Sequence, residues 1–337
     1  MRLPTPSSAT GFAASASRVR HLIRWCAGLL LACAAGAAAA NHYIVLNSND
    51  ATVSVIDSAT RKLVRLLDVG KEPHHLMEAP DGKSLLVGSS AGNLITFLDP
   101  VSGEVQKVVR NIDDPYQLAF SPDRKWFVVT CLRLNRVDIY TAADFKLVKR
   151  IPIGKLPSHL VFSPDSSMLF VTLQESDKIA AIDMVRQEVK WTLPVGTLPA
   201  GIWMGPDGKH LFVGIMGVDY VEVIDWRAQK TVQKIRTGKG AHNFLPVGDK
   251  RQLLVSNRVD NIISVIDMQE LKKVRDIKAP GGPDCMELSA DGKTLFYTAR
   301  WIKKLTLVDM ASGNVVDQIP VGRSPHGVYF AQHAPRQ

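Results

Sequence analysis

One segment of this chain recurs at a constant spacing of 42 residues, and this spacing limits the possible folds more than any other feature. A clear copy, residues 72–87, reads EPHHLMEAPDGKSLLV: a proline, two histidines, an apolar run, a Pro-Asp-Gly turn and a second apolar run. A fixed period in this range predicts a repeat architecture of the propeller or solenoid type. The copies begin at Pro73, Pro115, Pro157, Pro199, Ala241, Pro283 and Pro325.

Each repeat contains four short segments with the composition of β-strands. In the repeat that begins at Pro157, these segments are residues 159–162, 169–172, 179–182 and 189–193, and they are bounded by Pro, Gly, Ser and Asp. Short β-branched and aromatic runs bounded by turn residues are typical of antiparallel strands. Four of them per repeat predict a four-stranded propeller blade, and no segment shows sustained helical periodicity.

Aspartates occupy two fixed positions of the repeat. A side-chain oxygen at such a turn can accept a hydrogen bond from the backbone two residues further on, so turn capping is favoured over catalysis. The first turn holds Asp81, Asp123, Asp165, Asp207, Asp249 and Asp291, and the third segment ends at Asp57, Asp99, Asp183, Asp225, Asp267 and Asp309.

The two ends of the repeat region complement each other. Six complete repeats span residues 73–324, the chain enters at residue 43 with a second-strand pattern, and residues 325–330 supply an isolated first strand. A blade assembled from residues 325–330 and 43–72 would pair the exposed sheet edges and close the ring. The sequence therefore predicts an all-β, seven-bladed propeller forming a single domain over residues 41–337.

The first forty residues have the pattern of a signal peptide. Basic residues at 18–24 precede an apolar run from Trp25 to about Ala37, and three alanines at 38–40 fit a cleavage site. An alternative is a lipoprotein signal, because residues 30–33 read LLAC and would leave a lipid anchor on Cys33. Both interpretations predict an exported, periplasmic protein, and the apolar run is too short for a transmembrane helix.

Charge and cysteine content argue against a nucleic-acid-binding protein and against a fold held by disulfides. Without the first forty residues, 37 basic residues face 32 acidic ones, which is not the dense basic surface of a nucleic-acid-binding protein. The remaining cysteines, Cys131 and Cys285, occupy different positions in the repeat and make a poor disulfide framework. We expect a small-molecule or protein partner, and the sequence does not indicate an oligomeric state.

Several segments resemble a known family. The sequences YIVLN at 43–47, LFVT at 169–172 and SVID at 264–267 resemble the YVTN-type seven-bladed propeller repeat, across residues 41–330. Residues 68–74 and 323–330 are also similar to segments of cytochrome d1 propellers and haem d1 biosynthesis proteins. This second resemblance implies a haem d1-like tetrapyrrole. The chain lacks a Cys-x-x-Cys-His attachment site and long inserted loops, which argues against electron transfer and nitrite reduction.

Histidines concentrate at the start of the first strand of the repeat. Five of them fall on the two positions directly after the repeat-starting residue: His74, His75, His159, His242 and His326. Asp284 with Cys285, and Tyr116 with Gln117, fill the same positions in other repeats. The first strand of a blade lies nearest the propeller axis, so we expect a ring of imidazoles at one mouth of the channel. Which of the two positions faces the axis is left open.

Two interpretations of these histidines compete. In one, Pro-His is a repeated way to begin the strand, and each imidazole bonds a neighbouring carbonyl. In the other, the cluster binds a transition metal or a tetrapyrrole, because neutral imidazole is a common metal ligand. The candidate metal ligands are His74, His75 and His326. His159 and His242 are expected to lie too far away for one small coordination shell, and this spread favours a large flat ligand.

Loops between the second and third strands are expected on the same rim. They carry Arg133, Arg258, Arg300 and Trp301. Arginine binds carboxylates in bidentate fashion and tryptophan stacks on planar groups, so these residues suit an anionic conjugated cofactor.

Catalytic motifs do not occur in the sequence. Nucleophile-elbow, phosphate-loop, zincin and Cys-x-x-Cys patterns are missing, and only Asp284 and Glu287 are candidate acid–base groups for a lactonase-like hydrolase. The sequence therefore favours a non-catalytic scaffold that binds a ligand or partner at its histidine-bearing rim. The alternatives are a protein of tetrapyrrole or metal binding or biosynthesis and, more weakly supported, a hydrolase.

Overall fold

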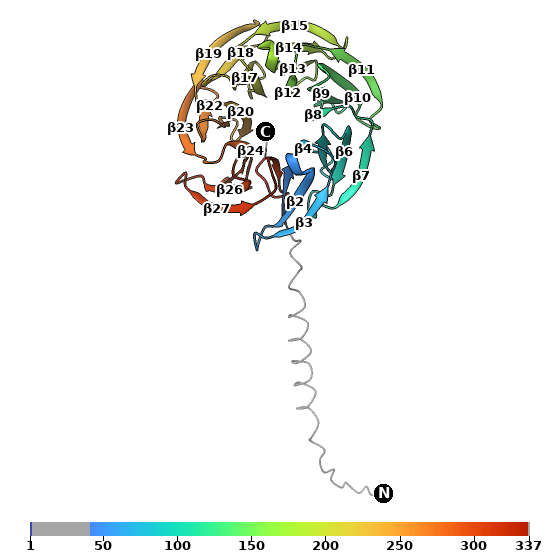
Figure 1. Cartoon of the computed structure of the whole chain (residues 1–337), viewed down its shortest axis with the longest axis vertical. Helices are drawn as coiled ribbons and strands as arrows, with labels where there is room; N and C mark the ends of the chain where they lie inside the picture. Colours follow the sequence, from blue (N-terminus) through green and yellow to red (C-terminus); the bar gives the residue numbers. More distant parts are fainter. Residues whose placement is uncertain (2–40, 336–337) are drawn as a thin grey trace. The chain divides into compact units, whose positions relative to one another are not determined.

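The computed structural model describes residues 41–335, together with Met1. The predicted signal peptide at 1–40, apart from Met1, and the alternative lipid-anchor residue Cys33 lie outside the described residues. Residues 41–337 form one compact unit, in which seven four-stranded antiparallel sheets stand around a central channel (Figure 1). The prediction of an all-β, seven-bladed propeller is confirmed.

Each of the first six blades is a consecutive up-and-down sheet whose first strand is innermost. The first blade comprises β4 (Pro73–Glu78), β5 (Leu85–Ser89), β6 (Leu94–Leu98) and β7 (Val105–Arg110). The second comprises β8 (Pro115–Phe120), β9 (Trp126–Cys131), β10 (Arg136–Thr141) and β11 (Leu147–Pro152), and the third β12 (Pro157–Phe162), β13 (Met168–Leu173), β14 (Lys178–Asp183) and β15 (Glu188–Pro194).

The next three blades repeat this order. The fourth blade comprises β16 (Pro199–Met204), β17 (His210–Ile215), β18 (Tyr220–Asp225) and β19 (Lys230–Arg236). The fifth comprises β20 (Ala241–Pro246), β21 (Gln252–Asn257), β22 (Ile262–Asp267) and β23 (Lys272–Lys278), and the sixth β24 (Pro283–Leu288), β25 (Thr294–Ala299), β26 (Lys304–Asp309) and β27 (Val315–Pro320). Two short 3₁₀ helices, η1 (Ser48–Asp50) and η2 (Gln174–Ser176), replace simple turns.

The seventh blade joins the two ends of the repeat region, as predicted. Its inner strand β28 (Pro325–Tyr329) pairs with β1 (His42–Asn47), which continues into β2 (Thr52–Asp57) and β3 (Leu63–Asp68). The backbone N–H of Gly322 donates to Asn47 Oδ1 at 2.9 Å, and Arg323 forms an ion pair with Asp50. Strands from both ends of the repeat region therefore complete this blade and close the ring.

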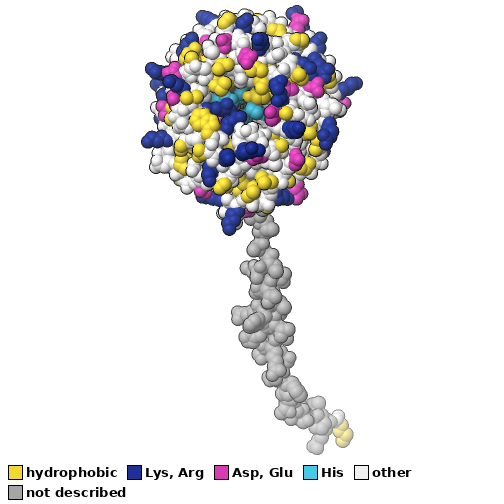
Figure 2. All heavy atoms as spheres, viewed as in Figure 1, with side chains coloured by type: hydrophobic (Ala, Val, Ile, Leu, Met, Phe, Trp, Pro, Cys, Tyr) yellow, Lys and Arg dark blue, Asp and Glu magenta, His cyan; other side chains and the backbone are white. Residues whose placement is uncertain are grey.

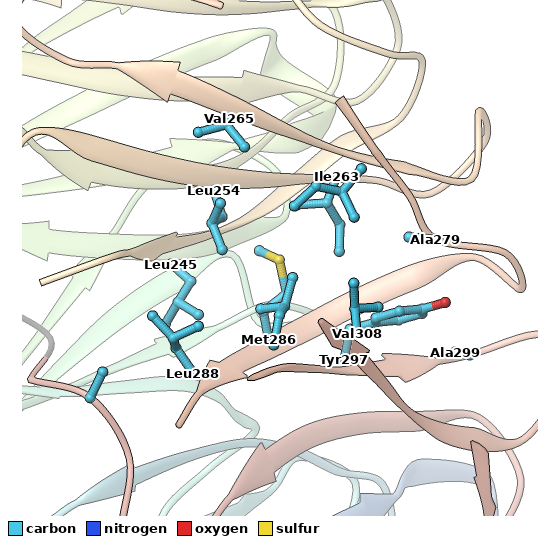
Figure 3. Packing of buried hydrophobic residues seen from close by; sticks show 13 residues of the cluster. Leu245, Leu254, Ile263, Val265, Ala279, Met286, Leu288, Tyr297, Ala299 and Val308 are labelled. Atoms are coloured by element: carbon cyan, nitrogen blue, oxygen red, sulfur yellow. The ribbon is translucent and has the colours of Figure 1, made fainter. Parts of the chain in front are cut away.

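The core lies between blades rather than in the channel. The middle strands β5 and β6 are buried along their whole length because another blade covers each face of the sheet, whereas the outer strand β7 is mostly exposed. Figure 3 shows one such contact, where Leu254 of the fifth blade packs near Met286 of the sixth. Full burial of a side chain of this size contributes about 1.5–3 kcal/mol, and the pattern repeats around the ring.

The aspartate turns cap the backbone as predicted. In six blades the first-turn aspartate Oδ1 accepts the N–H two residues further on, at 2.8–3.2 Å. These turns form the rim opposite the loops that enter the inner strands, because an inner strand runs from one rim to the other. The histidine-bearing rim is thus separated from this structural rim by the length of one strand.

Two remaining expectations concern cysteines and membranes. Cys131 is buried, Cys285 is partly exposed, and neither takes part in a disulfide in the described part of the chain. Among residues 41–335, no helix has the length and apolar character needed to cross a membrane.

Candidate functional site

A β-bulge at the start of each inner strand decides which side chains face the channel. In the first blade Pro73 pairs with Ser89 and His75 pairs with Gly88, so His74 is an extra residue in the ladder. Corresponding irregularities occur in the other six blades. A bulge re-aims the inserted side chain, and such bulges are common near functional sites. Consequently both positions after the repeat-starting residue contribute to the channel lining.

The five predicted histidines form one continuous group of rings, which we call the histidine cluster: His74, His75, His159, His242 and His326. The ring centroids of His74 and His326 lie 3.8 Å apart, and His75 lies 4.8 Å from each. His159 lies 5.1 Å from both His75 and His242. His159 and His242 adjoin the others through these ring contacts. As predicted, neither belongs to the group of described residues whose nitrogens lie close enough to share one ion.

The histidine cluster is enclosed but reachable from one face. His326 is completely buried, His159 and His242 are 2% exposed, and His74 is half-buried. Figure 2 shows histidine side chains on the floor of a hollow in the middle of one face, with Lys and Arg side chains at its edge. The arrangement places the imidazoles at the bottom of a basic mouth.

Enclosure also fixes the protonation state of the cluster. Burial, followed by the neighbouring His326 and His75, lowers the pKa of His74 well below its usual value. Burial, with help from the Arg258 guanidinium, lowers the pKa of His242 to about 4. His75, His159 and His326 also have lowered pKa values, mainly through burial. At neutral pH the imidazoles are therefore uncharged, and each carries a lone pair.

Several of these ring nitrogens have no hydrogen-bond partner. His74 Nδ1, His75 Nε2 and His159 Nε2 are buried and unpaired in the described structure. The partners that other cluster nitrogens do have are side chains: Ser158 lies 3.1 Å from His159 Nδ1, and Cys285 Sγ lies 3.4 Å from His326 Nδ1. Buried polar atoms are normally satisfied, so three unpaired ring nitrogens in one place call for an explanation.

Three of the histidines could share one ion. His74, His75 and His326 each offer a ring nitrogen within 4.8 Å of the others. Nitrogens bound to one tetrahedral zinc at about 2.0–2.1 Å stand roughly 3.4 Å apart, so modest ring rotations would bring this group into a coordination shell. Asp284, Cys285 and His326 form a second group with the same 4.8 Å limit. The predicted metal ligands thus lie together, and their ligation of an ion stays a prediction.

A buried ion cluster adjoins the histidines. Asp284, on β24, is completely buried, and its Oδ2 accepts hydrogen bonds from Arg258 at 2.5 Å and Arg300 at 3.0 Å. Its Oδ1 accepts a hydrogen bond from Asn243 at 2.9 Å and lies 3.3 Å from His242 Nδ1. Burial raises the pKa of Asp284, but the Arg258 guanidinium and the neighbouring histidines outweigh this and hold it well below its usual value. Asp284 is therefore ionised.

The predicted rim residues divide into two groups. Arg258 and Arg300 converge on Asp284 beside the histidine cluster, whereas Arg133 forms ion pairs with Asp114 at 2.7 Å and Glu72 at 2.6 Å. Arg133 lines a separate rim cavity of about 470 Å³ together with Asp113, Asp114 and Arg136. The three predicted cofactor-binding arginines therefore do not form one clamp.

The other two candidates lie apart from the ion cluster. Trp301 is 55% exposed, and it covers Gly282, where an added Cβ would lie 2.6 Å from the indole ring. Glu287 is completely buried further along β24, with its Oε1 accepting the backbone N–H of Leu288 at 3.2 Å. Only Trp301 is thus presented on the surface of the rim.

Two positioning residues were missed at the sequence level. Thr298 donates a hydrogen bond to the His326 carbonyl at 2.7 Å and accepts one from the Cys285 N–H at 3.1 Å, which holds both strands at the site. Thr130 and Thr172 make the same bond to the next inner strand, so their shared repeat position was an available signal. Asn243, which orients Asp284, has no feature in the sequence that would have identified it before the structure was known.

Comparisons with known proteins agree with this architecture. The family model that describes a YNCE-like beta-propeller matches residues 6–336. A functionally unknown protein from Desulfotomaculum acetoxidans superposes with a TM-score of 0.73 at 16% identity, covering 86% of this chain and 98% of that one. No curated protein matches the chain.

Two further solved structures come from named proteins. Kuenenia stuttgartiensis hydrazine synthase superposes with a TM-score of 0.64 at 20% identity, covering 75% of this chain and 87% of that one. The structure of dihydro-haem d1 dehydrogenase NirN in complex with DHE superposes with a TM-score of 0.65 at 18% identity, covering 87% of this chain and 75% of that one. At these identities the likeness shows the fold alone, and at that level it bears out the resemblance to haem d1 propellers.

Proposed function

The chain belongs to the YNCE-like β-propeller family, and we propose that it is a binding scaffold whose histidine cluster takes up a transition-metal ion at one mouth of the channel. The observation that carries this proposal is the set of buried ring nitrogens on His74 and His75 that lack a partner beside His326. An ion bound by the tautomer that presents a lone pair there would satisfy these nitrogens, and no neighbouring carbonyl or hydroxyl of the described residues does so.

The chemistry of the donors indicates which ions fit. Imidazole nitrogen suits Zn²⁺, Cu²⁺, Fe²⁺ and Ni²⁺, whereas Mg²⁺ and Ca²⁺ prefer oxygen ligands. Metal ligation requires neutral imidazole, and burial already keeps the pKa of His74 and His75 well below the usual value. Protons therefore compete weakly with the metal at neutral pH.

The geometry favours an ion over a tetrapyrrole. A spread of histidines was the reason to expect a large flat ligand. Each of the five rings instead lies 3.8–5.1 Å from its nearest neighbour, and three of them offer ring nitrogens within 4.8 Å of one another. The arginines expected to hold tetrapyrrole carboxylates are divided, since Arg258 and Arg300 bind Asp284 and Arg133 binds Asp114. A small ion needs neither a slot between the rings nor a three-arginine clamp.

The hydrolase alternative gains no support from the site. Asp284 binds two guanidinium groups, which stabilise its charged form and make it a weak base. The proposal is therefore one of binding, with export to the periplasm resting on the signal-like pattern of residues 1–40.

Calorimetric titration of the purified, untagged chain with Zn²⁺ and with Cu²⁺ tests the proposal. We expect one ion per chain. The affinity should fall at least about tenfold in His75→Ala and in His326→Ala, because even the loss of a residue that only hydrogen-bonds a metal ligand can reduce metal affinity that much. His210→Ala is the matched control, because His210 pairs with Asp207 at 2.6 Å on the opposite rim. Absence of binding, or equal affinity in all variants with retained β-sheet circular dichroism, would contradict the proposal.

A further inference from the structure

We propose that the histidine cluster takes its metal together with a small dicarboxylate anion, one carboxylate of which binds Arg258 and Arg300 while the other completes the metal shell. This inference rests on the proposed metal-binding function and specifies its ligand class. Arg258 Nη2 lies 3.5 Å from Nε2 of His326, one of the three candidate metal ligands. Arg300 binds Asp284 Oδ2, which lies 3.6 Å from the same nitrogen.

The group formed by Arg258, Arg300 and Asp284 has a net positive formal charge, which a bound anion would balance. Arg258 and Arg300 carry two positive charges against the single negative charge of Asp284, and histidines that ligate a metal are neutral. A divalent ion would therefore raise the local charge from +1 to +3 in a site removed from bulk water. Uncompensated charge in such surroundings is expensive, so a second anion would stabilise the loaded state.

The two arginines have donors to spare for that anion. Both bind the same atom, Asp284 Oδ2, each through one terminal nitrogen. A guanidinium group has five N–H donors, and Arg258 Nε is buried without a partner. The remaining donors suit the planar, two-oxygen geometry of a carboxylate.

The position of the arginines lets a ligand reach them. Arg258 directly follows β21 and Arg300 directly follows β25, so both stand on loops of the histidine-bearing rim. Their side chains are 17% and 27% exposed, whereas Asp284 beneath them is fully buried. The hollow with histidines on its floor and basic side chains at its edge in Figure 2 is consistent with an anion approaching from this face.

A two-carboxylate ligand fits this layout better than a single carboxylate. The candidate metal ligands supply three nitrogens, and a tetrahedral ion takes a fourth ligand. One carboxylate could fill that position while the second reaches the guanidinium groups. Malonate is therefore the probe, and acetate is the control with one carboxylate.

The experiment measures zinc affinity with and without malonate, at free zinc concentrations set by a metal buffer. We expect malonate to tighten zinc binding at least about tenfold, which corresponds to about 1.4 kcal/mol, and acetate to have a much smaller effect. By thermodynamic linkage, zinc must tighten malonate binding by the same factor. Arg300→Gln should abolish this effect of malonate, measured within the variant as the ratio of zinc affinity with malonate to zinc affinity without it.

Lys239→Gln is the matched control, since it removes one exposed positive charge from the same rim and should keep the effect of malonate. This inference is wrong if malonate tightens zinc binding equally in Arg300→Gln. It is also wrong if zinc binds but malonate does not tighten its binding. Neither result would contradict the metal site itself. If zinc binds neither alone nor with malonate, the proposed function itself is wrong and this inference falls with it.

Discussion

The imidazole rings of His74 and His326 lie with their centroids 3.8 Å apart, although His74 is on the inner strand of the first blade and His326 on that of the last. They become neighbours only because β28 pairs with β1 and closes the ring. The most closely packed pair of the histidine cluster therefore depends on the junction of the two ends of the repeat region.

Asp284→Asn should destabilise the fold strongly. The substitution leaves Arg258 and Arg300 facing a neutral amide in a buried cluster, and removing one partner of a buried ion pair costs about 3–5 kcal/mol. Urea unfolding followed by circular dichroism would measure the loss. Asp317→Asn, which breaks the exposed pair with Arg61, should cost no more than about 1 kcal/mol, and equal losses in the two variants would contradict this view of Asp284.

Stability should fall as the pH drops from about 6.5 towards 4. The pKa of His242 is about 4 in the folded protein and near 6.5 when the chain unfolds, so in this interval the unfolded state binds the extra proton. Each such histidine contributes a slope of about 1.4 kcal/mol per pH unit, with stability increasing as pH rises. Urea midpoints at several pH values would give the slope.

His242→Gln is the variant that isolates this effect. Its pH slope should be smaller than that of the unsubstituted protein by about one proton, because the glutamine does not titrate. His210→Gln, on the exposed opposite rim, is the control and should leave the slope in place. A slope that is identical in the His242 variant would show that this residue does not cause the acid sensitivity.

Gly201→Ala should be one of the most damaging small substitutions. An added Cβ would lie 2.0 Å from the His242 carbonyl oxygen, a backbone atom of the next blade, so the two inner strands would have to separate. We expect a loss of about 3 kcal/mol or more, the range of overpacking and strain in a tight core. Thermal and urea unfolding would show it.

The control for that substitution is Gly292→Lys. Nothing lies within 4 Å of a Cβ at Gly292, and although its φ is positive, Lys250 adopts the same conformation at the equivalent turn position. We expect a change below about 1 kcal/mol, as for a surface position without special contacts. Comparable losses at both glycines would refute the steric explanation.

Removal of residues 331–337 should weaken the fifth and sixth blades without affecting the site. Ala334 packs in the core between the fifth and sixth blades, its N–H donates to the Leu288 carbonyl at 2.7 Å, and Ala290 donates to the Gln332 carbonyl at 3.1 Å. Loss of these contacts should cost about 1–3 kcal/mol. Zinc affinity should stay within about twofold, because the tail follows the end of β28, on the rim opposite the histidines. A strong loss of zinc binding in a folded truncated protein would contradict this separation.

The repeat pattern predicted the fold because each of its features has a local cause. Proline or alanine begins every inner strand, aspartate caps the following turn, and the half-repeats at the two ends can only pair with each other. The strand starts and turn caps depend on residues that are close in sequence. The pairing of strands within each blade recurs every 42 residues, so it can be predicted from the repeat. The positions of the histidines within the blade were predicted for the same reason.

The site was predicted less completely because its contacts join separate blades. The sequence correctly kept His159 and His242 out of one small coordination shell, but it did not predict that their rings touch those of the other histidines, because blade order does not give the width of the channel. It also assigned Arg133 and Arg258 to one clamp, although their carboxylate partners, Asp114 and Asp284, direct them to different places.

The sequence by itself determined the seven blades, the shared last blade, and the rim on which the histidines fall. Only the tertiary structure decided that both bulge positions face the channel, that the five rings pack together, and that Asp284 gathers two arginines beside them. The physical reason is distance along the chain: strand periodicity and turn capping are set within one repeat, whereas the site arises where the inner strands of different blades converge on one axis.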